Sequence, residues 1–141
     1  MAMAGGKLLC DTGPLAAFFN RSDQYHSWAA EQFDRIFQPL VTCEAVLSET
    51  VFLLQEDGLA ADPVFEAVER QRLVVEFSAN EHWADLRRLI RKYQDLPMSL
   101  ADACLVRMAE IGGDCQVFTT DRDFRIYRRN GRHIIPLLAP F

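Results

Sequence analysis

Lys7-Leu8-Leu9-Cys10-Asp11-Thr12-Gly13-Pro14 is the stretch that decides the fold. An apolar run typical of a buried strand ends at the carboxylate of Asp11, and a turn-forming Thr-Gly-Pro follows directly. In open α/β sheets, functional groups gather at the carboxyl ends of the strands. We therefore expect a strand over the apolar residues 8–10, with Asp11 at the functional edge of the sheet.

Three further acids occupy comparable positions far along the chain. Glu49 lies in the middle of a helix predicted over residues 43–55, and its neighbours three and four positions away are apolar, so we expect it to point inward. Asp102 lies near the start of a helix predicted over residues 100–111, and Asp121 follows a predicted strand over residues 116–119. Four carboxylates that converge on one point repel one another unless a cation joins them. The sequence therefore predicts a divalent-metal site.

Each of these three acids also has a structural explanation. A partly buried pair with an arginine would account for Glu49. Ser99 and Asp102 have the spacing of a capping box, in which each side chain accepts a hydrogen bond from the backbone of the other. Asp121 follows a strand, where Asx turns are common. Helix capping and metal binding are compatible roles for Asp102.

The remaining segments alternate between helix and strand. Helices are predicted over residues 14–19, 25–37, 62–70 and 81–93, and strands over residues 39–41, 73–77 and 134–137. Thr42 and Asn80 are the expected N-caps of the helices that follow them. The last strand should lie at an edge, because Pro136 cannot donate to a ladder. The alternation predicts a three-layer α/β/α sandwich with a mainly parallel central sheet. We expect one domain over residues 1–141, with residues 1–6 as a flexible extension.

The composition limits the class of protein. The four cysteines lie in apolar settings without a Cys-x-x-Cys pair, which favours buried free thiols over a zinc site or a disulfide framework. The N-terminal residues have neither the basic region nor the apolar core of a signal peptide. No apolar run reaches the roughly 18 residues of a membrane span. We therefore expect a cytoplasmic protein that does not enter a membrane.

The charged residues argue against indiscriminate binding to nucleic acid, because the formal net charge is −5. Thirteen of the fifteen cations are nevertheless arginine, whose planar guanidinium suits bidentate contacts with phosphate. The arginines and lysines form two clusters: Arg87, Arg88, Arg91 and Lys92, and then Arg122, Arg125, Arg128, Arg129 and Arg132. A solvated helix face explains the first cluster. The second follows Asp121 directly, where phosphate binding is an equal alternative.

The chain resembles the PIN domain family, and most of all the VapC-type toxins of bacterial toxin–antitoxin modules. Four segments carry the resemblance: Leu9-Cys10-Asp11-Thr12-Gly13-Pro14-Leu15, Ala45-Val46-Leu47-Ser48-Glu49-Thr50, Met98-Ser99-Leu100-Ala101-Asp102-Ala103 and Phe118-Thr119-Thr120-Asp121-Arg122-Asp123-Phe124. Each segment is weakly specific alone. Their order and spacing over nearly the whole chain make the set specific.

The resemblance implies an α/β/α sandwich and a metal-dependent ribonuclease that is a homodimer and is inhibited by a cognate antitoxin. It implies that Mg²⁺ or Mn²⁺ is held by four acids, with Asp123 sharing or replacing the fourth: Asp11, Glu49, Asp102 and Asp121. Around them, five residues are expected to support the ligands or bind the phosphate of the RNA substrate: Thr12, Ser99, Thr120, Arg122 and Arg125. Carboxylate oxygens are the ligands that Mg²⁺ prefers, and a metal-bound water can attack a phosphodiester.

Two other classes of protein are the alternatives. Phosphotransfer folds also place an aspartate after the first strand, but they need a lysine near the phosphoryl group. The only lysines here, Lys7 and Lys92, lie before that strand and inside a predicted helix. The second alternative is a catalytically silent PIN-like module that binds RNA or a protein partner. A metal-binding titration separates this module from a nuclease.

Overall fold

The computed structural model describes residues 6–141, and its centre is a five-stranded parallel sheet of order β3-β2-β1-β4-β7. The strands are β1 (Lys7–Cys10), β2 (Leu40–Thr42), β3 (Leu73–Val75), β4 (Cys115–Phe118) and β7 (Leu137–Leu138). The helices are α1 (Thr12–Phe19), α2 (His26–Arg35), α3 (Glu44–Glu56), α4 (Asp62–Glu69), α5 (Trp83–Lys92) and α6 (Leu100–Gly112). Two 3₁₀ helices, η1 (Ala79–Glu81) and η2 (Arg122–Arg125), and a hairpin of β5 (Arg128–Arg129) and β6 (His133–Ile134) complete the chain.

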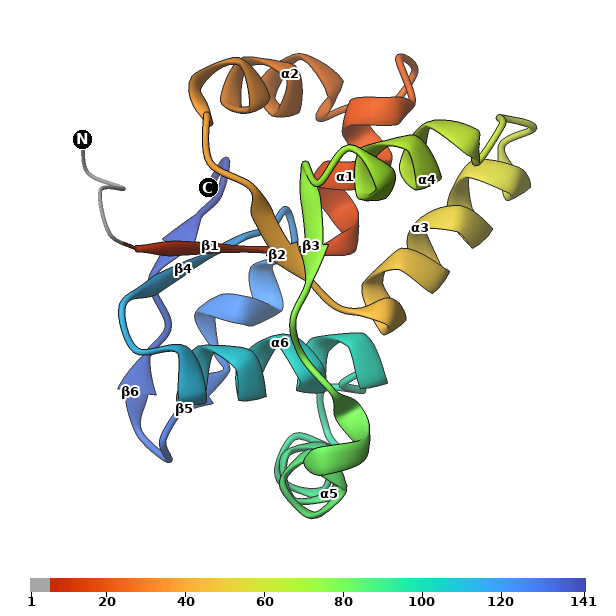
Figure 1. Ribbon diagram of the computed structural model, residues 1–141. Helices are drawn as coiled ribbons and strands as arrows, with labels where there is room; N and C mark the ends of the chain where they lie inside the picture. The colour runs from red at the N-terminus through yellow and green to blue at the C-terminus, as the bar shows by residue number, and fades with distance from the viewer. Residues whose placement is uncertain (1–5) are drawn as a thin grey trace.

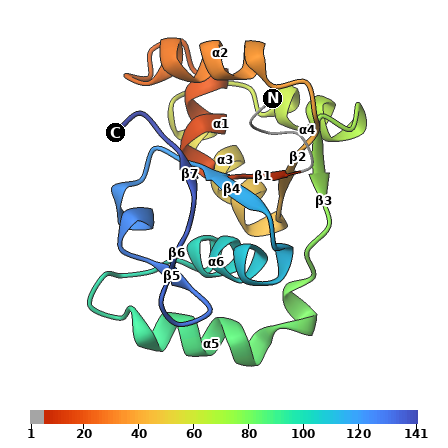
Figure 2. The ribbon, with the colours of Figure 1, turned by 90° about the vertical axis from the view of Figure 1, so that its left-hand side faces the viewer.

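The helices form layers on both faces of the sheet, as predicted. Helices α1 and α2 cover one face, and α6 covers the other with α5 behind it (Figures 1 and 2). The central strand β1 is buried throughout its apolar part, because Leu9 pairs with Val41 of β2 on one side and with Val117 of β4 on the other. A strand buried on both faces needs the continuous apolar run that the sequence has there.

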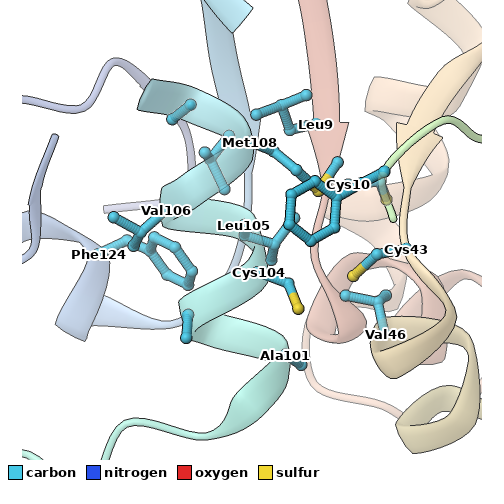
Figure 3. Packing of buried hydrophobic residues seen from close by; sticks show 14 of the residues in the cluster. Leu9, Cys10, Cys43, Val46, Ala101, Cys104, Leu105, Val106, Met108 and Phe124 are labelled. Atoms are coloured by element: carbon cyan, nitrogen blue, oxygen red, sulfur yellow. The ribbon is translucent and has the colours of Figure 1, made fainter. Parts of the chain in front are cut away.

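Helix α6 forms the core against the end of β1. Its Cys104 side chain extends toward Cys43, which follows β2, and Leu105 belongs to the same buried cluster as Cys10, the last residue of β1 (Figure 3). All four cysteines are buried free thiols, as expected, and all lie in the described part of the chain. This packing holds the first turn of α6 close to the carboxyl end of the central strand.

The predicted helices and strands are confirmed with small shifts, but two predicted caps are wrong. Thr42 does not cap α3; its hydroxyl donates to the carbonyl of Cys10 (2.9 Å), so it ties β2 to β1, and Cys43 takes the N-cap position. Asn80 lies within η1, and α5 begins at Trp83. The Asn80 side chain instead accepts a hydrogen bond from Trp83 Nε1 (3.1 Å). In both cases the side chain bonds another group and not the backbone N–H at the start of the next helix, as a cap would.

The C-terminal segment is more divided than the single strand predicted there. The turn at Asn130-Gly131, where both residues have positive φ, closes the β5–β6 hairpin. The chain then passes Pro136, whose carbonyl accepts from Val117 N (2.9 Å), and forms β7 as the edge strand.

The proposed extension over residues 1–6 lies almost wholly outside the described residues. Only Gly6 is described, and its carbonyl accepts a hydrogen bond from Gln38 Nε2 (2.9 Å). Within residues 6–141, no helix has the length and apolar character needed to cross a membrane.

Candidate active site

The carboxyl ends of β1 and β4 bring the first and last predicted acids to one edge of the sheet. Cys10 pairs with Phe118, so the residues that follow each strand leave the sheet side by side. Gly13 makes the approach possible, since a Cβ at this position would collide with the side-chain oxygen of Thr120. The turn after β1 and the segment that precedes Asp121 are therefore in contact.

Asp11 is a buried carboxylate with both oxygens in use. Only 5% of the residue is exposed. Its Oδ1 accepts from the Thr12 backbone N–H (2.7 Å) and so caps α1, and its Oδ2 accepts from the Thr119 hydroxyl (2.7 Å). Burial raises the pKa of Asp11 to about 7, and the nearby charges of Asp102 and Asp121 add to this effect, although the two hydrogen bonds oppose it.

A chain of hydrogen bonds joins Asp11 to two other acids. Thr12 Oγ1 donates to Glu49 Oε2 (3.2 Å), which links the start of α1 to α3. On the other side, the backbone N–H of Asp121 donates to Thr119 Oγ1 (2.9 Å). Two threonines thus hold Glu49 and Asp121 on either side of the buried carboxylate.

Glu49 faces the site, but the expectation that it points into the interior is wrong. The residue is exposed. Its apolar neighbours Phe52 and Leu53 are themselves 59% and 42% exposed, so the apolar face of α3 is only partly covered. The apolar residues around Glu49 in the sequence predicted that this face of α3 is buried. The fold leaves part of that face exposed to solvent.

Asp102 reaches the site from the first turn of α6. It forms the predicted capping box: Ser99 Oγ accepts from Asp102 N (3.0 Å), and Asp102 Oδ2 accepts from Ser99 N (3.4 Å). The same Oδ2 also accepts from the hydroxyl of Tyr127 (3.2 Å). Burial raises the pKa of Asp102 to about 6, with further contributions from Asp121 and Glu49.

Tyr127 is a site residue that the sequence analysis missed, as is Thr119, whose hydroxyl donates to Asp11. Tyr127 is fully buried, and burial together with the adjacent Asp102 raises the pKa of its phenol. The phenol therefore stays protonated and donates to the carboxylate. The place of Tyr127 as an aromatic residue within an arginine-rich segment was the only sequence signal, and that signal did not indicate Asp102 as the partner.

Asp121 and Asp123 lie in one short turn. Asp121 Oδ1 accepts from Asp123 N (2.9 Å) and caps η2, so the Asx-type turn exists alongside any metal-binding role. Burial raises the pKa of Asp123, and the charge of Asp121 contributes.

The acids share an electrostatic environment but are not gathered to coordination distance. Among residues 6–141, no three His, Cys, Asp or Glu side chains come close enough together to hold a metal ion. In that same range none of the five predicted ligands forms a salt bridge with Arg, Lys or His. A buried carboxylate with a pKa near 7 and acids around it lacks compensating positive charge, and hard oxygen donors suit Mg²⁺ or Mn²⁺. The residues present therefore fit a divalent cation.

The other predicted residues surround this group. Thr12 and Thr120 lie at the contact between the two strand ends, and Ser99 caps α6. Arg122 and Arg125 project from η2 onto the ring of Phe141. A groove of about 450 Å³ lies elsewhere, between α2 and α4, and is lined by none of the five predicted metal ligands.

The five-stranded parallel sheet with helices on both faces is the fold of a known class of protein. The PIN domain family model matches residues 8–130, and the chain belongs to this family. The phosphotransfer alternative is thereby excluded, and the predicted sandwich is confirmed. Among solved structures, Mycobacterium tuberculosis VapC20, described as a sarcin–ricin loop cleaving toxin, superposes with a TM-score of 0.71 at 23% identity. The alignment covers 83% of this chain and 92% of VapC20. No curated protein matches the sequence.

Proposed function

We propose that this protein is a divalent-metal-dependent endoribonuclease, the toxin of a VapC-type toxin–antitoxin pair. The observation that carries the proposal is the buried Asp11 carboxylate, whose pKa of about 7 reflects burial and nearby acids without a cationic partner among the described residues. Family membership supports a nuclease, and the fold shared with VapC20 supports the toxin class.

The ligands in this proposal are Asp11, Glu49, Asp102 and Asp121, with Asp123 beside them. A bound Mg²⁺ or Mn²⁺ would activate a water and offset charge on the scissile phosphate. The chain's own residues orient the donors. Thr12 and Thr119 fix the Asp11 carboxylate, and Tyr127 and Ser99 fix that of Asp102. Such hydrogen-bonded partners hold metal ligands in place.

The proposed partners are an RNA substrate, a cognate antitoxin and a second copy of the chain, and the proposed location is the cytoplasm. These assignments rest on the likeness to VapC-type toxins.

A catalytically silent PIN module is the second candidate, and two observations favour it. Both oxygens of Asp11 are occupied by hydrogen bonds within the protein, and no three potential ligands in the described part are gathered for a metal. Such a module would bind RNA or a protein without cleaving it.

The test compares wild type with Asp102→Asn on labelled RNA in Mg²⁺ or Mn²⁺. Both hydrogen bonds to Asp102 end on one oxygen, so the amide retains its acceptor and the fold should be kept. Asp34→Asn on α2, an exposed acid away from the site, is the matched control. We expect cleavage by wild type and Asp34→Asn, and loss of cleavage with Asp102→Asn or EDTA. Cleavage that persists in excess EDTA would refute the metal mechanism.

A further inference from the structure

Four of the five arginines that follow Asp121 divide into two pairs by what they bind. Arg128 Nη1 donates to the carbonyls of Arg125, Ile126 and Tyr127 at 2.8 to 3.1 Å. Arg129 Nη1 donates to the carbonyl of Gly113 (2.8 Å). These two guanidinium groups therefore donate to backbone carbonyl groups of the protein itself. Arg122 and Arg125 are exposed, and neither pairs with an acid within residues 6–141.

One aromatic ring, that of Phe141, contacts both Arg122 and Arg125. They are separated by three positions on η2, and in a 3₁₀ helix such side chains lie on the same face. The ring of Phe141 lies 4.9 Å from Arg122 Cζ and 5.5 Å from Arg125 Cζ. The contact follows from the sheet. Phe118 of β4 pairs with Leu138 of the parallel strand β7, so the segments after the two strands leave the sheet at the same edge. The segment that ends at Phe141 therefore lies beside the segment after β4 (Figure 2).

Stacking of this kind orients the guanidiniums without using their donors. A guanidinium over a ring face keeps its N–H groups in its own plane, where they can bind a planar or tetrahedral anion. Two like charges on one ring also repel each other, and an anion between them relieves that repulsion. Arg122 is adjacent to Asp121 in the chain, so such an anion would lie beside the acids of the site.

We propose that Arg122 and Arg125 form a clamp for one RNA phosphate that neighbours the scissile phosphate, and that Phe141 is the positioning residue of this clamp. The proposal rests on the proposed ribonuclease function. RNA fits better than an acidic peptide because its phosphates are regularly spaced. One phosphate can then lie at the acids while the next reaches the arginines.

The first measurement is RNA binding in the Asp102→Asn background, where cleavage is expected to be absent. Affinity for a labelled single-stranded oligonucleotide is followed against salt concentration in Mg²⁺. Each phosphate neutralised in a single strand contributes about −0.7 to the slope of log K against log salt. We expect the double variant Arg122→Gln/Arg125→Gln to weaken binding severalfold and to reduce the slope by about 0.7. Arg21→Gln, an exposed arginine beyond the far end of α1, should change the slope much less.

The second measurement isolates Phe141. Phe141→Leu keeps an apolar side chain but removes the ring, and we expect it to weaken RNA binding severalfold. Phe37→Leu, at a phenylalanine that is 94% exposed and distant from the arginines, is the control. In the double-arginine variant, Phe141→Leu should have no further effect, because the ring acts through the guanidiniums. An equal effect with and without the arginines would overturn the positioning role.

Cleavage kinetics with the acids intact separate the clamp from the proposed function. The double-arginine variant should raise KM severalfold and keep kcat, since a neighbouring phosphate is bound alike in ground and transition states. If wild type binds RNA through the arginines but never cleaves it, the ribonuclease proposal fails and the clamp stands. If wild type cleaves and the arginine variants match Arg21→Gln in KM and slope, the clamp fails. Arginine-dependent binding of a poly-glutamate peptide in place of RNA would also overturn it.

Discussion

Neutralising the buried acid should stabilise the metal-free protein, in a way that depends on pH. The pKa of Asp11 is raised from 3.8 to about 7, so the folded state holds this proton more tightly than the unfolded state does. The cost of ionising Asp11 in the folded protein is small below pH 4 and grows as pH rises to 7. Ionisation of Asp11 therefore lowers the free energy of unfolding of the protein as pH rises from about 4 to 7.

The magnitude follows from the two pKa values. A shift of about three units at about 1.36 kcal/mol each gives a cost on the order of 4 kcal/mol at pH 8. Asp11→Asn removes that cost but weakens the bond from Thr119 to Oδ2, which is worth about 1 kcal/mol. We expect a net gain of roughly 2–3 kcal/mol at pH 8 in EDTA, or a rise in Tm of roughly 5–10 °C. Near pH 4 the gain should vanish.

The assay is thermal or urea unfolding of wild type and Asp11→Asn from pH 4 to 8 in EDTA, with Asp34→Asn as the control for loss of an exposed acid. The difference between the two proteins at each pH cancels the titration of most other groups. Saturating Mn²⁺ should reverse the order, because a ligand at about 1,000 times its Kd stabilises wild type by about 4.1 kcal/mol, which exceeds the expected gain of the variant. An Asp11→Asn protein less stable than wild type at pH 8 in EDTA would refute the reasoning, since it would mean that the charge of Asp11 is already compensated.

Three further outcomes are expected. Glu49→Gln should raise the Tm of the metal-free protein slightly, because one like charge leaves the group of acids; a clear fall in Tm would make Glu49 a structural partner instead. Asp121→Asn should weaken Mn²⁺ binding, measured by calorimetric titration, more than Asp123→Asn does, because the end of β4 positions Asp121 directly; the opposite order would exchange their roles. Tyr127→Phe removes the donor to Asp102 and should lower both the free energy of unfolding, by about 1 kcal/mol, and the affinity for Mn²⁺; unchanged metal affinity would limit Tyr127 to a packing role.

Local sequence patterns determined the framework and most of the acids. The apolar run of β1 ends at Asp11, and both the strand and the cap of α1 depend on neighbouring residues only. The capping box of Ser99 and Asp102 likewise involves residues three apart. Alternating strands and helices then imply a parallel sheet, and its carboxyl edge collects the acids.

The tertiary structure decided the contacts between residues far apart in the chain. The bond from Thr119 to Asp11 spans 108 positions, and that from Tyr127 to Asp102 spans 25. The exposure of Glu49 depends on which part of α3 the fold covers, and the ring of Phe141 reaches the arginines of η2 only because β7 lies beside β4. No periodicity encodes such pairs, because they arise from how the elements pack and not from the conformation of any one of them.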